Sequence, residues 1–187
     1  MAPKIAVFAS GSGSNFQALH NAIEAQKLNA ELVVMVTDKP EAFVVERANK
    51  VGVEALAFSP KTYDTKAAYE QAVIAALQQR GVEWIVLAGY MRLVSEVLLQ
   101  AYPNRIVNIH PSLLPSFPGK DAIGQAIAHG VKVTGVTVHY VDEGMDTGPI
   151  IAQRAVNIIE GDVEATEAAI HRVEHELYTE ALNQILK

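Results

Sequence analysis

The chain has 187 residues, of which half are apolar and 19% are charged, so it can bury a sizeable core and is not intrinsically disordered. The net charge of −6 disfavours nonspecific binding to nucleic acid or to an anionic membrane. The absence of cysteine excludes disulfides, thiolate metal sites and cysteine nucleophiles. No apolar run is long enough for a signal-peptide core or a membrane span, so we expect a cytoplasmic protein.

Short apolar runs without polar alternation predict strands that are buried on both faces. These runs lie at residues 5–9, 32–36, 84–88 and 106–109. Helical spacing predicts one helix from about Asn15 and another from about Lys66 to Arg80, ending at Gly81. The alternation of strands and helices favours an α/β fold with a Rossmann-like, mostly parallel sheet flanked by helices.

The last third of the chain follows a different pattern. Two predicted strands, residues 133–141 and 150–158, follow each other without a helix between them, so we expect an antiparallel extension of the sheet. A long amphipathic helix from about residue 163 closes the chain. No repeat, low-complexity tract or linker interrupts the pattern, which favours a single domain over residues 1–187.

The segment Ser10–Asn15 (SGSGSN) lies between the first predicted strand and the first helix. Glycines let the backbone approach a ligand closely, and a helix N-terminus offers unpaired amides to an anion. The third glycine of a dinucleotide fingerprint would fall at Phe16, and the Lys-Ser/Thr end of a P-loop is missing, so the loop favours a single phosphate. The alternative is a plain turn in which Ser14 or Asn15 caps the helix.

Asn108 and His110 are two apart on a predicted strand, so their side chains project from the same face. Pro111 ends the strand pairing and places both residues at a carboxyl edge, where open α/β sheets bind ligands. An amide donor beside an imidazole suits oxyanion stabilisation and proton transfer. The alternative is a pair of residues that satisfies buried polar groups.

The loop after residue 141 contains Asp142, Glu143 and Asp146. Its spacing fails the calcium-loop template, and an aspartic-protease site would need a second Asp-Thr-Gly triplet. A carboxylate of this loop close to His110 would favour the charged imidazole, whereas a solvated acidic turn is the alternative.

The segment His171-Arg172-Val173-Glu174-His175 matches an inverted zincin pattern, but no third zinc ligand is evident, and solvated helix polarity is the default interpretation. His139, on a predicted strand, can line the same cleft as the other candidate residues.

Two segments resemble the signatures of the folate-dependent formyltransferase family. They are His110–Pro115 with Pro118-Gly119, and Gly135–Pro149. Together with Ser10–Asn15 and Met91–Val94, they make the resemblance closest to the branch that acts on phosphoribosylglycinamide, and it extends over essentially the whole chain. It implies formyl transfer from 10-formyltetrahydrofolate to the amine of phosphoribosylglycinamide, giving phosphoribosylformylglycinamide and tetrahydrofolate in de novo purine biosynthesis.

The resemblance also implies which residues act. It assigns catalysis to Asn108, His110 and Asp146. It assigns the ribonucleotide to Gly13, Ser14, Asn15 and Glu174. It assigns the folate to Lys66, Met91, Arg92, Leu93, Val94, Asn108, Val141, Glu143 and Gly144.

Two positions depart from what some relatives carry. Lys66 stands where some have arginine, and only arginine would bind a folate carboxylate bidentately. Asp121 stands where some have histidine, so no role of that histidine transfers to this chain. The resemblance further implies a phosphate-binding half at about 1–100 and a catalytic and folate-binding half at about 101–187. The partners it implies are the two small-molecule substrates, with no metal, nucleic acid or membrane. The state of assembly it implies is a monomer or a homodimer.

Three other activities of the family and one other class of protein remain as alternatives. Formylation of methionyl-tRNA and hydrolysis of formyltetrahydrofolate are expected to require additional domains that this sequence does not contain. Formylation of a sugar nucleotide is disfavoured by the phosphate-loop match alone. A nucleotide-binding module without catalytic activity would bind NAD rather than the ribonucleotide and a folate.

Overall fold

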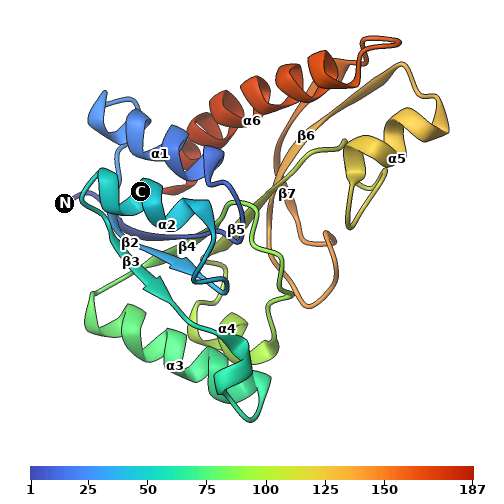
Figure 1. Cartoon of the computed structure of the whole chain (residues 1–187). Coiled ribbons are helices and arrows are strands. Elements are labelled where there is room, and N and C mark those ends of the chain that lie inside the picture. Colours follow the sequence, from blue (N-terminus) through green and yellow to red (C-terminus); the bar gives the residue numbers. More distant parts are fainter.

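The computed structural model describes all 187 residues and contains one seven-stranded sheet in the order β3-β2-β1-β4-β5-β6-β7. The strands are β1 (Lys4–Phe8), β2 (Glu31–Thr37), β3 (Glu54–Ala57), β4 (Trp84–Leu87), β5 (Ile106–His110), β6 (Val133–Tyr140) and β7 (Ile150–Asn157). The first five strands pair in parallel, and β6 pairs antiparallel with both β5 and β7. The predicted fold class is confirmed (Figure 1).

Six α-helices accompany the sheet. They are α1 (Ser14–Glu24), α2 (Phe43–Lys50), α3 (Lys66–Gln79), α4 (Glu96–Ala101), α5 (Ala122–His129) and α6 (Val163–Ile185), with a 3-10 turn at Pro60–Thr62. The predicted helices at Asn15, at Lys66 and at the end of the chain are confirmed within a few residues, whereas α2, α4 and α5 were not predicted. None of the helices is both long enough and apolar enough to cross a membrane.

The central strands carry apolar side chains on both faces because both faces are covered. In β1, Ile5 and Val7 belong to a buried cluster that also contains residues of α1, α2 and α6. The alternate residues Ala6 and Phe8 belong to a second cluster, with residues of α3 and α4. Figure 1 shows these two groups of helices on opposite sides of the sheet.

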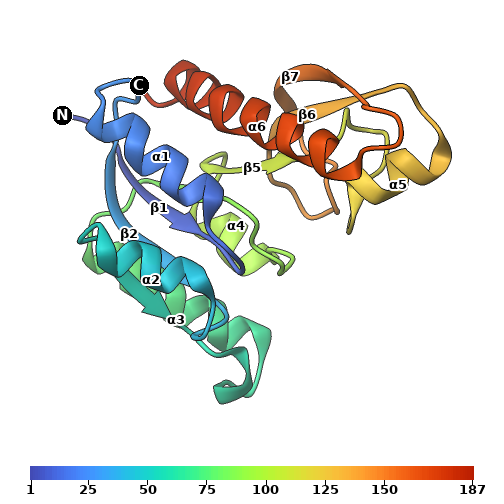
Figure 2. The same ribbon diagram turned by 45° about the horizontal axis from the view of Figure 1, so that its top comes forward.

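Helix α6, at the C-terminal end of the chain, packs against α1 and against the middle of the sheet. Its N-cap Asp162 accepts a hydrogen bond from the amide of Ala165 at 2.9 Å. The buried Tyr178 donates from its hydroxyl to the carbonyl oxygen of Leu87 in β4, at 2.6 Å. Figures 1 and 2 both show α6 beside α1, so residues near 174 lie close to the loop after β1.

The order of the strands places the site. Strand β1 leads to α1 on one side of the sheet, and its neighbour β4 continues away from it toward β5. The strand order therefore reverses between β1 and β4, and open α/β sheets bind ligands in the crevice at the carboxyl ends of such strands. The loops that begin at Ala9 and Ala88 lie at this crevice.

Candidate active site

The loop after β1 forms an open end for helix α1. Its N-cap is Gly13, with φ 77° and ψ 27°, and no side chain caps the helix. The alternative interpretation, a plain turn in which Ser14 or Asn15 caps the helix, is therefore wrong. A Cβ at Gly13 would lie 2.5 Å from Cγ2 of Val44, so only glycine fits here. The first-turn amides are left free to bind an anion in the cavity that Gly11–Asn15 lines.

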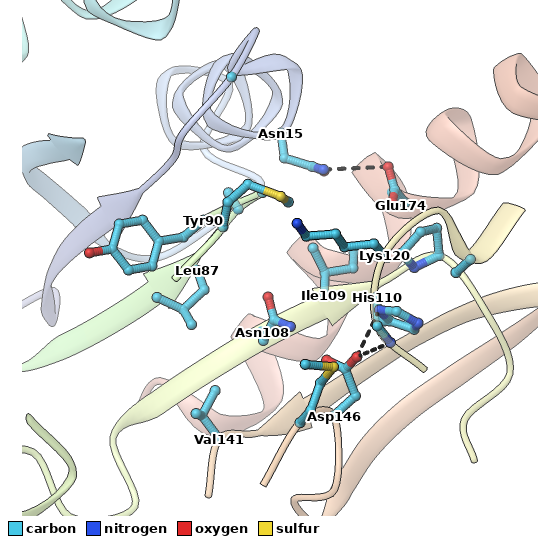
Figure 3. A pocket seen from close by; sticks show the side chains of 18 of the residues that line it. Asn15, Leu87, Tyr90, Asn108, Ile109, His110, Lys120, Val141, Asp146 and Glu174 are labelled. Atoms are coloured by element: carbon cyan, nitrogen blue, oxygen red, sulfur yellow. Dashed lines mark hydrogen bonds and ion pairs between the residues drawn. The ribbon is translucent and has the colours of Figure 1, made fainter. Parts of the chain in front are cut away.

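Glu174 reaches this loop from α6. Asn15 donates from Nδ2 to its Oε2 at 3.4 Å, and His171 Nδ1 contacts the same oxygen at 2.9 Å. Glu174 is buried, and Oδ1 of Asn15 is buried without a hydrogen-bond partner. An unpaired acceptor on a cavity wall favours a ligand that carries a donor, such as a hydroxyl group. Both residues, which the resemblance assigned to the ribonucleotide, line the cavity (Figure 3).

The ion pair between His171 and Glu174 predicts a pH-dependent contribution to stability. The hydrogen bond to Glu174 raises the pKa of His171 above 6.5, although burial opposes this. Because the pKa is higher in the folded than in the unfolded state, protonation of His171 contributes to the free energy of unfolding. This contribution is fully present below about pH 6.5 and is lost as the pH rises through the folded-state pKa. The loss of stability in His171→Gln should therefore shrink with rising pH, from at most about 1 kcal/mol because the histidine is half-exposed. Urea denaturation of both proteins at several pH values measures it, and a difference that does not change with pH contradicts it.

The predicted trio meets at the carboxyl end of β5. Asn108 and His110 lie on this strand, and Asp146 lies in the loop between β6 and β7. His110 Nδ1 is 3.5 Å from Oδ2 of Asp146. The same oxygen accepts a hydrogen bond from the amide of Gly119 at 2.8 Å. Figure 3 shows Asn108, His110 and Asp146 facing one space.

Both ring nitrogens of His110 face acceptors. Its Nε2 lies 2.8 Å from the carbonyl oxygen of Phe117, on the other side of the ring from Asp146. A neutral imidazole has a single N–H and cannot donate to both groups, whereas an imidazolium can. The two acceptors are therefore placed to stabilise positive charge that forms on the ring.

His139 orients Asn108. Its Nδ1 donates to the carbonyl oxygen of Tyr140 at 2.8 Å, which leaves Nε2 as an acceptor for Nδ2 of Asn108 at 3.4 Å. Burial lowers the pKa of His139, while the bond to Tyr140 and the charge of Asp146 act in the opposite direction. The ring is therefore neutral near pH 7, and it holds the carboxamide of Asn108 with its Nδ2 group toward His139. The expectation that His139 lines the cleft is confirmed.

A second wall of the cavity follows β4. The amide of Met91 donates to Ser10 Oγ at 2.9 Å, and Ser10 in turn donates to the buried Asp38 at 2.5 Å. Arg92 lies over the ring of Tyr69, with 4.9 Å between its guanidinium carbon and the ring centroid. The exposed, apolar Met91 and Leu93 offer a surface on which a flat ring system can stack.

Of the other residues that the resemblance assigned to the folate, some line the cavity and some do not. Val141 and Gly144 line the cavity together with Met91–Val94. Lys66, the first residue of α3, and the exposed Glu143 lie outside its lining. The amide of Gly119 and the side chain of Lys120 also belong to the site and were not predicted. The sequence signal for both was their position directly after Pro118 in the first signature segment.

The loop Gly11–Asn15, the trio and the wall after β4 line one cavity of about 610 Å³. This volume suits a ligand of the size of a nucleotide or a cofactor. The structure contains no group of three or more histidines or carboxylates arranged to hold a metal ion. In the zincin-like segment, His171 instead pairs with Glu174, as described above.

Comparisons with known proteins agree with this geometry. The chain matches the formyl transferase family over residues 3–182. It is 55% identical to a phosphoribosylglycinamide formyltransferase of Bacillus subtilis, over 98% of this chain and 94% of that protein. It is 43% identical to a trifunctional purine biosynthetic protein of Drosophila pseudoobscura pseudoobscura, over 96% of this chain but only 13% of that much longer protein.

Solved structures show the same relationship. The glycinamide ribonucleotide transformylase 1 of Geobacillus kaustophilus superposes with a TM-score of 0.97 and 57% identity, and each chain is covered completely. A phosphoribosylglycinamide formyltransferase of Bacillus halodurans superposes with a TM-score of 0.95 and 54% identity, over 98% of this chain and 95% of that chain. The family resemblance is confirmed: this chain belongs to the formyl transferase family.

Proposed function

We propose that the trio of Asn108, His110 and Asp146 carries out the transfer of a formyl group from 10-formyltetrahydrofolate to the amine of phosphoribosylglycinamide. The reaction is that of the phosphoribosylglycinamide formyltransferases to which the chain is similar over its full length. The observation that carries the residue assignment is that the trio shares one cavity with the uncapped N-terminus of α1. A phosphate at one end of this cavity leaves the rest of the ribonucleotide directed toward the trio.

The ribonucleotide binds between α1 and α6 in this proposal. Its phosphate accepts hydrogen bonds from the free amides of Gly13, Ser14 and Asn15. The ribose hydroxyls lie against Glu174 and Oδ1 of Asn15, which supply a buried carboxylate and an unpaired acceptor.

The folate occupies the other side of the cavity. Its pteridine ring packs between the Met91–Val94 segment and the loop that contains Val141 and Gly144, all of which line the cavity. Lys66 and Glu143 lie outside the lining, so in this proposal they meet only the parts of the cosubstrate that extend toward solvent.

The chemistry joins the two substrates directly. The glycinamide amine attacks the formyl carbon, a new C–N bond forms, and negative charge develops on the formyl oxygen. Asn108 donates a hydrogen bond to this oxygen, and the imidazolium of His110 stabilises the charge. The bond between the formyl carbon and N10 of the folate then breaks. The attacking amine loses one proton, and N10 gains one as it leaves. Asp146, 3.5 Å from His110, offsets the positive charge on the ring in the transition state and assists the proton movement through water.

No metal takes part in this proposal. The amide and imidazolium supply the electrophilic assistance that a Lewis acid supplies in other acyl transfers. The division into a phosphate-binding half at about 1–100 and a catalytic and folate-binding half at about 101–187 remains part of the proposal. Glu174, which meets the ribonucleotide, and Met91–Val94, which meet the folate, cross this division. A cytoplasmic location and a monomeric or homodimeric state also belong to the proposal, and cell fractionation and sedimentation test them.

Product analysis tests the function. With both substrates present, we expect formylglycinamide ribonucleotide and tetrahydrofolate in equal amounts. Release of formate without formation of the ribonucleotide product would instead indicate a hydrolase. Binding of NAD, with no affinity for the ribonucleotide or for a folate analogue, would indicate a nucleotide-binding module.

Gly13→Ala tests the phosphate cradle. Alanine is disfavoured at φ 77°, and its Cβ would collide with Val44, so the loop must shift away from the phosphate. We expect the KM for the ribonucleotide to rise about tenfold or more, with a smaller effect on the KM for the folate. The matched control is Gly11→Ala, because a Cβ at Gly11 meets no atom within 4 Å. Equal effects of the two substitutions on the KM for the ribonucleotide would contradict the assignment.

A further inference from the structure

The side chain of Lys120 points into the cavity, and the mechanism described so far does not use it (Figure 3). We propose that the Lys120 ammonium binds the phosphate of the ribonucleotide opposite the amides of α1. This inference rests on the proposed function, because it names the group that completes its phosphate site. Lysine binds phosphate as a point charge and needs no fixed bidentate geometry.

The backbone on both sides of Lys120 is held in place. The amide of Gly119 donates to Asp146, so the residue before Lys120 contacts the catalytic carboxylate. The carbonyl oxygen of Lys120 accepts a hydrogen bond from Nε2 of Gln125 at 2.7 Å. Asp121, at φ 50°, caps α5 by accepting from the amide of Gly124 at 3.2 Å. These contacts fix the origin of the lysine side chain beside the trio.

The charge balance of the cavity calls for a cation. Its lining contains five carboxylate residues: Asp121, Asp142, Asp146, Glu167 and Glu174. Against these stand two permanently charged cations, Arg92 and Lys120. Arg92 is already engaged with the face of Tyr69, whereas Lys120 forms no ion pair. A dianionic phosphate entering this cavity is therefore expected to attract the free ammonium group.

The direction of the side chain favours the phosphate over the folate. Figure 3 shows the Lys120 ammonium between Asn15 and Asn108, on the Asn15 side of the trio and away from Val141. The phosphate loop itself, Ser10–Asn15, contains no lysine or arginine. In a P-loop the lysine that pairs with phosphate follows the glycines directly in sequence. Here a lysine about a hundred residues away would supply that charge.

Calorimetric titration of Lys120→Met with two ligands tests the proposal. The ligands are phosphoribosylglycinamide and the same compound without its phosphate. We expect the phosphorylated ligand to bind about ten- to a hundredfold more weakly than it binds to the parent protein, and the affinity for the other ligand to stay within about twofold. Lys120→Arg should recover most of the lost affinity. The control, Lys27→Met, removes an exposed lysine after α1 that does not line the cavity and should leave both affinities unchanged.

The other outcomes separate this inference from the proposed function. An equal loss for both ligands, no loss for either, or a loss confined to a folate analogue would overturn the assignment of Lys120 to the phosphate. A parent protein that binds the ribonucleotide but transfers no formyl group would overturn the proposed function. In that case the same titrations would still measure what Lys120 contributes to phosphate binding.

Discussion

His110→Ala is expected to lower kcat by a factor of about 10³ or more while both substrates still bind. The imidazolium both stabilises the developing oxyanion, which is typically worth about 10²–10³ in rate, and takes part in proton transfer, which is typically worth about 10²–10⁴. Neither contribution is made to the bound substrates before the reaction. The affinities for the ribonucleotide and for a folate analogue should therefore change by less than about tenfold.

The substitution also removes a buried side chain, so its fold must be checked. His110 is buried, and its loss leaves the carbonyl oxygen of Phe117 without its partner. His110→Gln is the companion variant, because its amide can still donate to Phe117 although it cannot act as an acid. Both variants should be equally inactive if the chemistry requires the imidazole, and His129→Ala on the exposed end of α5 should remain fully active. Near-normal turnover in His110→Gln would remove His110 from the mechanism.

Asp146→Asn is expected to lower kcat by about 10²-fold or more. The carboxylate of Asp146 lies 3.5 Å from Nδ1 of His110, where it stabilises positive charge on the ring. A neutral amide in its place removes this counter-charge, so the transition state loses stabilisation while both substrates still bind. Measurement of kcat with both substrates saturating tests this.

The substitution Asp146→Asn is compatible with the backbone conformation at this position. Asp146 has φ 56°, in the left-handed region that asparagine adopts as readily as aspartate. The oxygen of the new amide can still accept from Gly119, so the loop keeps this contact and mainly the charge is lost. Asp142→Asn, in the same loop, is the comparison and should change kcat much less. A near-normal kcat in Asp146→Asn would argue against an electrostatic role of Asp146.

The sheet could be predicted from the sequence because its central strands are buried on both faces and therefore read as continuous apolar runs. The elements that were not predicted have weaker patterns. Strand β3 has four residues, all of them at least partly exposed, and α4 has six residues, too few for a helical period to stand out. These short elements are held by contacts that are distant in sequence, such as Glu70, which accepts from the amide of Ser95 at the start of α4.

The candidate site could be predicted in part, for a similar reason. Asn108 and His110 share a face because they are two apart on one strand, which is a local property. Their meeting with Asp146 depends on how the loop after β6 folds back, which no local pattern shows, and the family resemblance was needed to select this carboxylate. The free amides at the N-terminus of α1 were predicted, but the sequence left a cap at Ser14 or Asn15 as an alternative, and only the structure shows that Gly13 is the N-cap and lies against Val44 of α2.

A crystal structure with the ribonucleotide and an unreactive analogue of 10-formyltetrahydrofolate tests the central claim most directly. The account predicts the phosphate at the amides of Gly13–Asn15, and the carbonyl oxygen of the analogue within hydrogen-bond distance of Asn108 Nδ2. It also predicts the glycinamide amine at the carbonyl carbon, beside His110. A complex with both ligands ordered but the carbonyl group distant from these two side chains would contradict it.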